Sequence, residues 1–501
     1  MRPTRLAAAV LTVLFAAAMA FSGQRPPQRL VILHFNDFHG QVEGVKAKDG
    51  SLSGGVSRLA GLVERERRSA ADAGEPSILL FAGDMLTGTA FSSLFQGEPE
   101  FHVLALLRAD AAVPGNHEWD DGLGVFEKRA LEVPFPFLAA NVRREDGSPS
   151  FLRPFTTVRA GRARIGVIGV TTPETPLTTA PGNTKGFLFS DPVEAVTAAL
   201  ASPDAARWDA VVVLSHCGFE TDVRIAEACP RVSLVVGGHD HKVIEKPVPA
   251  GRAVVVQAGD RGRFLGEVTL TVSGPGAVSA DGRLIAVDAS SPEDAEVAAY
   301  VKPFLVKEEE ELGTVLGRLP APLSGDRQLL RSSETPLGDL IADAMRQATG
   351  ADCAFVNGGA IRGGLPGGDV RQRDIYGCLP YFDSVHTTVL TGAQIQALLD
   401  RCAAMPTTDP PGGFLQLSGV QAVYAGSKAQ KILIAGSPLE AGRRYTVACT
   451  NFLASGGDGL EEFTQGSDLR DWGVGLQDLL RRELARPDLV LPTAGSRILR
   501  P

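Results

Sequence analysis

The chain has 501 residues and a formal net charge of −9 at pH 7. This length exceeds one ordinary domain, so two or three domains are expected. The hydrophobic fraction of 44% is ordinary for a soluble globular protein, and the acidic balance argues against a nucleic-acid polymer as partner.

The first twenty residues have the pattern of a secretory signal peptide. Arg2 and Arg5 precede an apolar run over residues 6–17, and Ala-Met-Ala at 18–20 is a small-x-small cleavage pattern. The run is too short to span a bilayer as a membrane anchor. We therefore expect residues 1–20 to be removed and the mature protein to be exported, to the periplasm or the extracellular space, without a membrane anchor.

Apolar runs alternate with helical patterns over the next part of the chain, which we take as a first domain over residues 28–290. Strands are expected at 30–36, 77–82, 111–113, 135–141, 163–170, 210–214, 232–236, 254–257 and 265–272, and helices at 54–70 and 101–107. Such alternation predicts a layered α/β domain with much parallel sheet. In sheets of this kind, ligands bind outside the carboxyl ends of the strands.

Polar motifs follow five of these strands directly. They are Asp37-Phe38-His39, Gly83-Asp84, Asn116-His117 with Asp120, Ser215-His216 and His239-Asp240-His241. Five of the eight histidines stand in these loops, and carboxylate and imidazole together suit a divalent metal. So many ligands at one rim predict two neighbouring metal ions that share a bridging carboxylate, for which Asp84 is the natural candidate.

The six cysteines show no Cys-x-x-Cys spacing, which argues against structural zinc. In an oxidising compartment some of them could pair, and the sequence does not choose among the pairings. Cys217 adjoins His216 and could be a thiol nucleophile or a small apolar residue beside a ligand. The second interpretation is favoured.

The composition changes between residues 291 and 312. Ser291 is expected to cap a helix, with Pro292 in the first position and Asp294 completing a capping box. The segment is rich in glutamate, so we expect a solvated interdomain helix over 291–312, which Pro303 should kink or divide.

A second domain is expected over residues 313–501. It alternates predicted strands at 353–356, 385–390 and 445–450 with predicted helices at 337–349, 392–401 and 476–484. This alternation again predicts an α/β domain.

The strand-end motifs of the first domain, taken together, resemble those of the calcineurin-like metallophosphoesterases. In the second domain, Asn357-Gly358-Gly359-Ala360-Ile361-Arg362 and Asn451-Phe452-x-Ala454-x-Gly456-Gly457-Asp458-Gly459 resemble the C-terminal domain of the secreted 5′-nucleotidase family, which includes bacterial periplasmic UDP-sugar hydrolases. The resemblance covers nearly the whole mature chain. It implies a four-layer α/β/β/α metallophosphoesterase domain joined by a helix to a smaller α/β substrate-binding domain.

The resemblance also implies roles for the rim residues. The first metal would be held by Asp37, His39, Asp84 and His241, and the second by Asp84, Asn116, His216 and His239. His117 would be a non-ligand that meets the substrate's phosphate, with Asp120 orienting its imidazole; for Glu118 and Trp119 a structural role is favoured. The two divalent ions would be Mn, Zn, Co or Mg, and a metal-bound hydroxide would attack phosphorus in line.

The second domain would supply the substrate pocket. Residues implied in substrate binding are Arg327, Arg331, Asn357, Arg362, Tyr381, Phe382, Phe452 and Asp458. The arginines would bind an anion, the aromatic residues would stack on a nucleobase, and Asp458 would accept from ribose hydroxyls. Tyr381-Phe382-Asp383 replaces the commoner Phe-Gly-Asn, which leaves the base preference open.

The leading hypothesis is an exported two-metal phosphohydrolase that releases phosphate from nucleoside 5′-monophosphates, with UDP-sugars or other nucleotides as further candidate substrates, acting as a monomer or weak oligomer. A 2′,3′-cyclic-nucleotide phosphodiesterase/3′-nucleotidase or a sulfur-compound hydrolase on the same scaffold is the alternative. A non-catalytic exported binding protein is a more remote hypothesis, because binding alone does not need His117 and Asp120.

Overall fold

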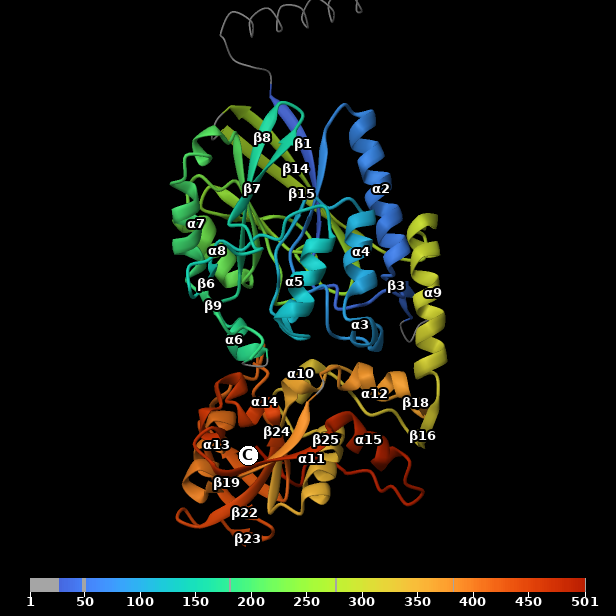
Figure 1. Ribbon diagram of the computed structural model, residues 1–501, viewed down its shortest axis with the longest axis vertical. Coiled ribbons are helices and arrows are strands. Elements are labelled where there is room, and N and C mark those ends of the chain that lie inside the picture. The colour runs from blue at the N-terminus through green and yellow to red at the C-terminus, as the bar shows by residue number, and fades with distance from the viewer. Residues whose placement is uncertain (1–26, 47–50, 180–181, 275–276, 382, 501) are drawn as a thin grey trace, which may run out of the picture.

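The computed structural model describes residues 27–46, 51–179, 182–274, 277–381 and 383–500. It has two domains, one above the other in Figure 1, and helix α9 (Ala295–Leu312) runs between them at one side. The predicted signal peptide, residues 1–20, lies outside the described residues. Within the described part of the chain, no helix combines the length and the apolar character needed to cross a membrane.

Two sheets packed face to face form the centre of the first domain. The first sheet has the order β15 (Ala277–Ala286), β14 (Phe264–Gly274), β1 (Gln28–Phe35), β4 (Ser77–Phe81), β5 (Ala111–Ala112). The second has the order β12 (Val248–Ala250), β13 (Ala253–Val256), β11 (Leu234–Val236), β10 (Ala210–His216), β8 (Ala163–Thr171), β7 (Phe155–Ala160). Ile32, Leu80, Val167 and Val212 belong to the buried apolar core between the two sheets.

Helices cover the outer faces of both sheets. The first sheet packs against α2 (Val56–Asp72), α3 (Ala90–Phe95), α4 (Glu98–Leu106), α5 (Leu123–Glu132) and α9, and the second against α7 (Pro192–Leu200) and α8 (Phe219–Ala228). The predicted four-layer α/β/β/α order is therefore confirmed. Short strands β2 (Val45–Lys46), β3 (Leu52–Ser53), β6 (Val142–Arg144) and β9 (Phe187–Phe189) form two further ribbons.

Three neighbouring strands of the first sheet and four of the second are parallel, as the alternating pattern predicts. β1, β4 and β5 are parallel in the first sheet, and β8, β10, β11 and β13 are parallel in the second. The antiparallel strands β7, β12, β14 and β15 lie toward the edges. The carboxyl ends of the parallel strands therefore meet at one rim of the domain.

The second domain is also α/β. Its main sheet has the order β20 (Leu415–Ser418), β17 (Cys353–Asn357), β24 (Arg444–Thr450), β19 (Ser384–Thr391), β25 (Ser467–Gly475). One face packs on α11 (Pro336–Thr349), α12 (Gln372–Cys378) and α15 (Leu476–Leu484). The other packs on α13 (Gly392–Ala404) and on a small sheet of β23 (Ser437–Pro438), β22 (Lys428–Ile434), β21 (Val420–Ala425) and β26 (Ile498–Leu499).

The predicted strand over residues 135–141 is wrong. Only isolated bridges form there, from Phe137 to Ala112 and from Leu138 to Arg153. Pro134 and Pro136 lack the N–H group that a continuous ladder needs at those positions. The segment instead crosses the end of β5, where the Pro136 carbonyl accepts from Ala112 N.

The start of the interdomain helix also differs from the prediction. Asp294, not Ser291, is the N-cap of α9, because its carboxylate accepts from the backbone N–H groups of Glu296 (3.0 Å) and Val297 (2.9 Å). Asp294 N in turn donates to Ser57 O of α2 (2.8 Å). This bond holds residues 291–293 against α2, and they are not helical. Pro303 lies inside the helix and does not divide it.

All six cysteines are free and buried, so none of the possible pairings forms in this structure. Burial raises the pKa of the Cys217 thiol well above its usual value. A buried neutral thiol is a poor nucleophile. Cys217 therefore fits the predicted small apolar residue beside His216.

Candidate active site

The rim residues share an unusual backbone conformation. Asp37, His39, Asp84, His239 and His241 all have positive φ angles, between 50° and 86°. Non-glycine residues rarely adopt this region, and where they do, the site is often functional. These turns follow β1, β4 and β11, so the strand ends bend sharply and direct polar side chains into one space.

Asp84 lies at the centre of this space. Its Oδ2 atom is 3.1 Å from His216 Nε2, 3.9 Å from His39 Nε2 and 4.0 Å from His117 Nε2. Gly115 lies against the same carboxylate, and a Cβ at this glycine would collide with Asp84 Oδ1. One carboxylate thus faces imidazoles from three separate loops, the arrangement expected of a bridging ligand.

Three overlapping groups have ligand atoms close enough to hold a metal ion. They are Asp37, His39 and His241; His39, Asp84 and His117; and Asp84, His216 and His239. In the first group, His241 Nε2 is 3.3 Å from Asp37 Oδ1 and 3.0 Å from His39 Nε2. The first and third groups match three members each of the two ligand sets that the sequence resemblance implies.

The hydrogen bonds of the imidazoles fit metal binding. His39 Nδ1 lies 2.8 Å from Thr87 O, and His216 Nδ1 lies 2.7 Å from Ala82 O. A carbonyl only accepts, so Nδ1 donates and a neutral ring presents the lone pair of Nε2. Both Nε2 atoms face Asp84 Oδ2, and two acceptors that face each other need a cation or a proton between them.

Two buried polar atoms support the same conclusion. Among the described residues, neither Asn116 Oδ1 nor His216 Nε2 has a hydrogen-bond partner. Leaving buried polar atoms unpaired is costly, so such atoms call for an ion or a water molecule. Imidazole nitrogen, carboxylate and amide oxygen are a donor set suited to divalent metals.

Asp84 and the neighbouring imidazoles shift one another's pKa values. Burial acts to raise the pKa of Asp84, but the neighbouring His216 and His117 hold it well below its usual range. Burial acts to lower the pKa of His216, but the Asp84 carboxylate outweighs this and raises it to about 10. The pKa of His39 falls well below normal because of burial and the adjacent His241. Cationic charge is therefore favoured beside Asp84.

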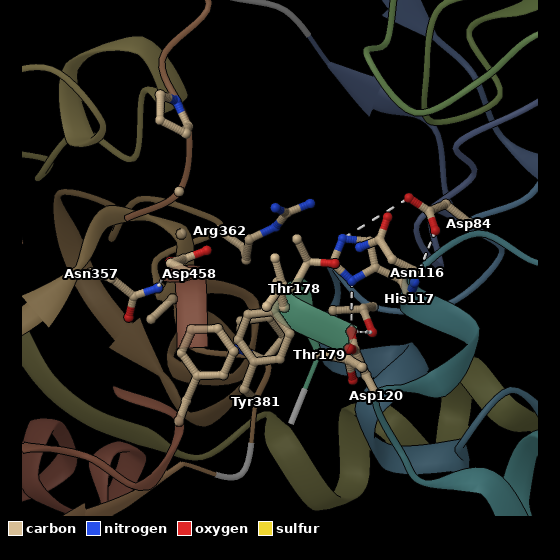
Figure 2. Close-up of a pocket in the computed structure, with 18 of the residues that line it drawn as sticks. Asp84, Asn116, His117, Asp120, Thr178, Thr179, Asn357, Arg362, Tyr381 and Asp458 are labelled. Carbon is tan, nitrogen blue, oxygen red and sulfur yellow. Dashed lines mark hydrogen bonds and ion pairs between the residues drawn. The ribbon is translucent and has the colours of Figure 1, made fainter. Parts of the chain in front are cut away.

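His117 and Asp120 form a close dyad, drawn in Figure 2. His117 Nδ1 is 2.6 Å from Asp120 Oδ2, and the same oxygen accepts from Thr87 Oγ1 at 2.8 Å. Asn183 Nδ2 donates to the Asp120 carbonyl at 2.9 Å. The carboxylate fixes a proton on Nδ1, which leaves His117 Nε2 to act toward the Asp84 side of the site.

Two further carboxylates support the site. Glu118 is fully buried and accepts from the backbone N–H groups of Asp84 (3.0 Å) and Met85 (2.6 Å), so it has the structural role that was favoured for it and holds the Asp84 loop. Asp260, which was not predicted, has its Oδ2 atom 3.6 Å from His241 Nδ1. Asp260 follows β13 just as the predicted ligands follow their strands, and that signal could have revealed it.

A cavity of about 770 Å³ lies between the domains and joins the rim to the second domain. Among the predicted substrate residues, those lining it are Arg327, Arg331, Asn357, Arg362, Tyr381, Phe452 and Asp458. Phe382 lies outside the described residues. Figure 2 shows Tyr381, Arg362 and Asp458 on the side of the cavity opposite Asp84 and Asn116.

The wall that the second domain contributes carries three arginines and the hydrogen-bonded pair of Asn357 and Asp458. Burial, together with repulsion from Arg362 and Arg327, lowers the pKa of Arg331 to about 9. Asp458 accepts from Asn357 Nδ2 at 2.7 Å, and burial raises its pKa to about 6. An anionic substrate group would relieve the repulsion among the three guanidinium groups.

Residues of the first domain also reach over this cavity, which the sequence did not predict. Thr178 of α6 (Thr175–Thr178) and the adjacent Thr179 line it together with Asn183. The ring of Tyr381 stacks on that of His117, with centroids 6.2 Å apart and an interplanar angle of 28°. Both domains therefore surround the same space.

Comparison with known proteins gives matches along most of the chain. Residues 30–243 match the calcineurin-like phosphoesterase family model, and residues 315–465 match the 5′-nucleotidase C-terminal domain model. The predicted boundaries, at 28–290 and 313–501, extend beyond these ranges and stay predictions. The chain is 28% identical to human 5′-nucleotidase in an alignment that covers 99% of this chain and 94% of that one.

A bacterial relative and two solved structures are similar as well. A Vibrio cholerae 5′-nucleotidase is 26% identical, with 91% of each chain covered. A 5′-nucleotidase precursor from Thermus thermophilus superposes with a TM-score of 0.81 at 28% identity, covering 94% of this chain and 99% of that one. The sulfate thiohydrolase SoxB of Thermus thermophilus has a TM-score of 0.76 at 20% identity, covering 95% and 97%, which supports the fold alone.

The two domain matches occur in the same order as the two domains of the structure. The first carries the cluster of candidate metal ligands, and the second carries the opposite wall of the cavity. The chain therefore belongs to the 5′-nucleotidase family, in which a calcineurin-like phosphoesterase domain precedes a 5′-nucleotidase C-terminal domain, and it is a metal-dependent phosphoester hydrolase.

Proposed function

We propose that this protein is an exported hydrolase that releases phosphate from nucleoside 5′-monophosphates. The single observation that carries the proposal is the interdomain cavity. One wall holds Asp84 and His117, and the other holds Arg362, Phe452 and Asp458. A phosphate group at the first wall would leave a nucleoside beside the second.

Two divalent ions would be held by the ligand sets already named, with Asp84 shared between them. When bound, such ions supply Lewis-acid catalysis and stabilise negative charge on the phosphoryl group. Manganese, zinc, cobalt and magnesium are the candidates. Asn116 would contribute its amide oxygen, Oδ1, which has no hydrogen-bond partner among the described residues.

The protein's own side chains would orient the substrate and manage charge. Arg327, Arg331 and Arg362 bind the anionic group through forked hydrogen bonds. With Asp120 fixing the proton on Nδ1, a protonated His117 donates from Nε2 to a phosphoryl or leaving-group oxygen. Phe452 stacks on the base, and Asp458 accepts from ribose hydroxyls.

The ring of Phe452 lies over a glycine-rich loop that precedes and contains Asp458. A Cβ at Gly457 would collide with this ring, so only glycine lets the loop pass beneath it. Asp458 itself has a positive φ of 55°. The flat ring of Phe452 suits stacking on a base. The Asp458 carboxylate, on a strained loop beside that ring, suits hydrogen bonds from the ribose.

A phosphodiesterase acting on UDP-sugars or 2′,3′-cyclic nucleotides is the second candidate. Tyr381 and Asp383 line the cavity where the commoner family pattern has Phe and Asn. A phenol and a carboxylate offer different hydrogen bonds from a phenyl ring and an amide, so the preferred substrate could differ from a plain monophosphate.

A substrate panel tests the proposal. AMP, UDP-glucose, 2′,3′-cyclic AMP and bis(4-nitrophenyl) phosphate are each assayed with Mn²⁺, Zn²⁺, Co²⁺ and Mg²⁺. The proposal expects the highest kcat/KM for AMP. A higher value for a diester would favour the second candidate, and no turnover of any phosphoester would contradict both.

A further inference from the structure

A second cavity, of about 280 Å³, lies beside the first on the side of the cleft that α9 closes. Its wall combines Arg261 of the first domain, Leu305 and Glu308 of α9, and Gly363 of the second domain. Arg362 lines both cavities. The second cavity is therefore next to the metal-ligand cluster.

Arg261 is tied directly to the metal-ligand loops. Its backbone N–H donates to the carbonyl of Asp37 at 2.7 Å, and its φ angle is 53°, a conformation that non-glycine residues rarely adopt. It directly follows Asp260, the carboxylate behind His241. The main chain of Arg261 is therefore held beside the site, at a conformational cost of the kind that functional positions show.

The guanidinium groups of Arg261 and Arg362 lack a full counter-charge. The ion pair of Arg261 is with Asp260, at 3.8 Å, and Asp260 also contacts Arg263 and His241. Among the described residues, no carboxylate forms an ion pair with the guanidinium group of Arg362. Burial and repulsion from Arg362 both lower the pKa of Arg261.

The carboxylates around the second cavity are engaged elsewhere or stand at its edge. Asp374 accepts from Arg371 N at 2.6 Å, which caps α12. Burial raises the pKa of Glu308 to about 7, so its negative charge is weakened, and Glu43 is exposed. Three arginines line the cavity: Arg373 forms an ion pair with Glu309 of α9, which leaves Arg261 and Arg362, one from each domain, as the pair that an anion would bridge.

We propose that Arg261 and Arg362 bind inorganic phosphate in this second cavity and take up the phosphate product as it leaves the metal-ligand cluster. The proposal rests on the phosphoester hydrolysis proposed above. Guanidinium groups bind phosphate through paired, charge-assisted hydrogen bonds. Since the two arginines belong to different domains, the bound phosphate would also hold the domains together until they separate.

Arg261→Gln tests the site, and Arg263→Gln is the matched control. Arg263 lies in the same loop and pairs with the same carboxylate, Asp260, but does not line the cavity. Phosphate inhibition of AMP hydrolysis is measured for both variants, and inorganic phosphate is titrated into the metal-loaded full chain by calorimetry.

Arg261→Gln is expected to raise the inhibition constant of phosphate about tenfold or more relative to the KM for AMP, since it removes a charged partner, and to remove one binding event from the titration. Arg263→Gln is expected to behave as the wild type in both measurements. Unchanged phosphate binding and inhibition in Arg261→Gln would overturn the proposal.

The titration separates this proposal from the proposed function. If the wild type does not hydrolyse AMP but binds phosphate in an Arg261-dependent manner, the nucleotidase proposal fails and the phosphate site stands. If Arg261→Gln lowers kcat/KM for UDP-glucose while phosphate binding is unchanged, the cavity holds a remote part of the substrate, and the product site is overturned.

Discussion

At the residue scale, three of the five imidazoles in the site have Nδ1 committed to a hydrogen bond. The Nδ1 atoms of His39 and His216 are paired with backbone carbonyls, and that of His117 with Asp120. When an ion is bound beside Asp84, the first two rings would present the lone pairs of Nε2 to it, while Nδ1 of the third ring is held by a side-chain carboxylate. This difference separates candidate metal ligands from a candidate proton donor.

His117→Asn should keep the metal content of the wild type and lower kcat by about 10²–10⁴-fold, the size of a general-acid or electrostatic contribution. The ligands of both proposed ions remain, and only the dyad is lost. Metal content is measured by elemental analysis alongside kcat. His102→Asn is the control, because His102 is exposed on α4 and stacks on Tyr300 away from the site.

Metal loss in His117→Asn would instead make His117 a ligand. The structure allows this outcome, since His117 is close enough to His39 and Asp84 to share an ion with them. The elemental analysis therefore decides between the two roles.

Phe452→Ala should lower kcat/KM for AMP much more than for 4-nitrophenyl phosphate. One stacking face on a base is worth about 1–3 kcal/mol, and a small aryl phosphate has no nucleoside to reach the second wall. Steady-state kinetics on the two substrates give the ratio. Equal losses on both would mean that Phe452 only packs against the loop at Gly457.

At the element scale, the site depends on where strands end and how the chain turns there. The ends of β1, β4, β5, β10 and β11 carry the polar motifs to one rim. Helix α9 then joins the two domains, and its first turn is fixed to α2 through the bond from Asp294 N to Ser57 O.

Asp294→Ala should lower the free energy of unfolding of the first domain by about 1 kcal/mol, the usual cost of losing an N-cap carboxylate. Urea denaturation followed by circular dichroism measures the change. Glu310→Ala is the control: Glu310 is exposed on the same helix, and substitutions of exposed residues change stability little. If the two variants lose the same stability, Asp294 is not the functional cap.

Much of this architecture could be predicted from the sequence. Continuous apolar runs identify the buried parallel strands, and several of these runs end at a polar motif, so the sequence places Asp37, Asp84 and His216 at one rim. The helix at 476–484 was predicted with the same ends that the structure has. Local sequence patterns are enough to predict a residue's position where that position depends only on the helix or strand that contains it or ends at it.

The prediction failed where a local proline signal was overlooked and where a tertiary contact decides the structure. The prolines at 134 and 136 prevent a regular strand in an otherwise apolar run. Ser291 and Asp294 are both suitable caps, and the bond from Asp294 N to Ser57 O of α2 favours the start of α9 at Asp294. Thr178 reaches the cavity from a segment far from the other lining residues in the sequence, so no local pattern marks it, whereas Asp260 follows β13 and its position could have revealed it.

At the scale of the whole molecule, the cavity exists because the two domains face each other. Its walls come from both, and Ser93 Oγ donates to Pro380 O across the boundary at 3.2 Å. Besides such contacts the domains are joined by α9, a helix with many exposed glutamates. A product held between the walls would leave most easily if the domains separate.

A disulfide between Ser93→Cys and Pro380→Cys should therefore stop multiple turnovers while allowing at most one. Phosphate release is followed by rapid mixing before and after reduction, and the single-cysteine variants are the controls. The native cysteines are all buried and free, so they should not compete for oxidation. Undiminished steady-state turnover in the fully cross-linked protein would show that the domains need not part.

The most direct measurement of the central claim is the metal content and AMP turnover of Asp84→Asn. Asp84 faces His39, His117 and His216 together, so both proposed ions depend on its carboxylate. The wild type should bind about two divalent ions per chain, as expected for a carboxylate-bridged pair, while the variant should lose bound metal and all measurable turnover. A variant that keeps two ions per chain and a near-normal rate would contradict a metal centre built around Asp84.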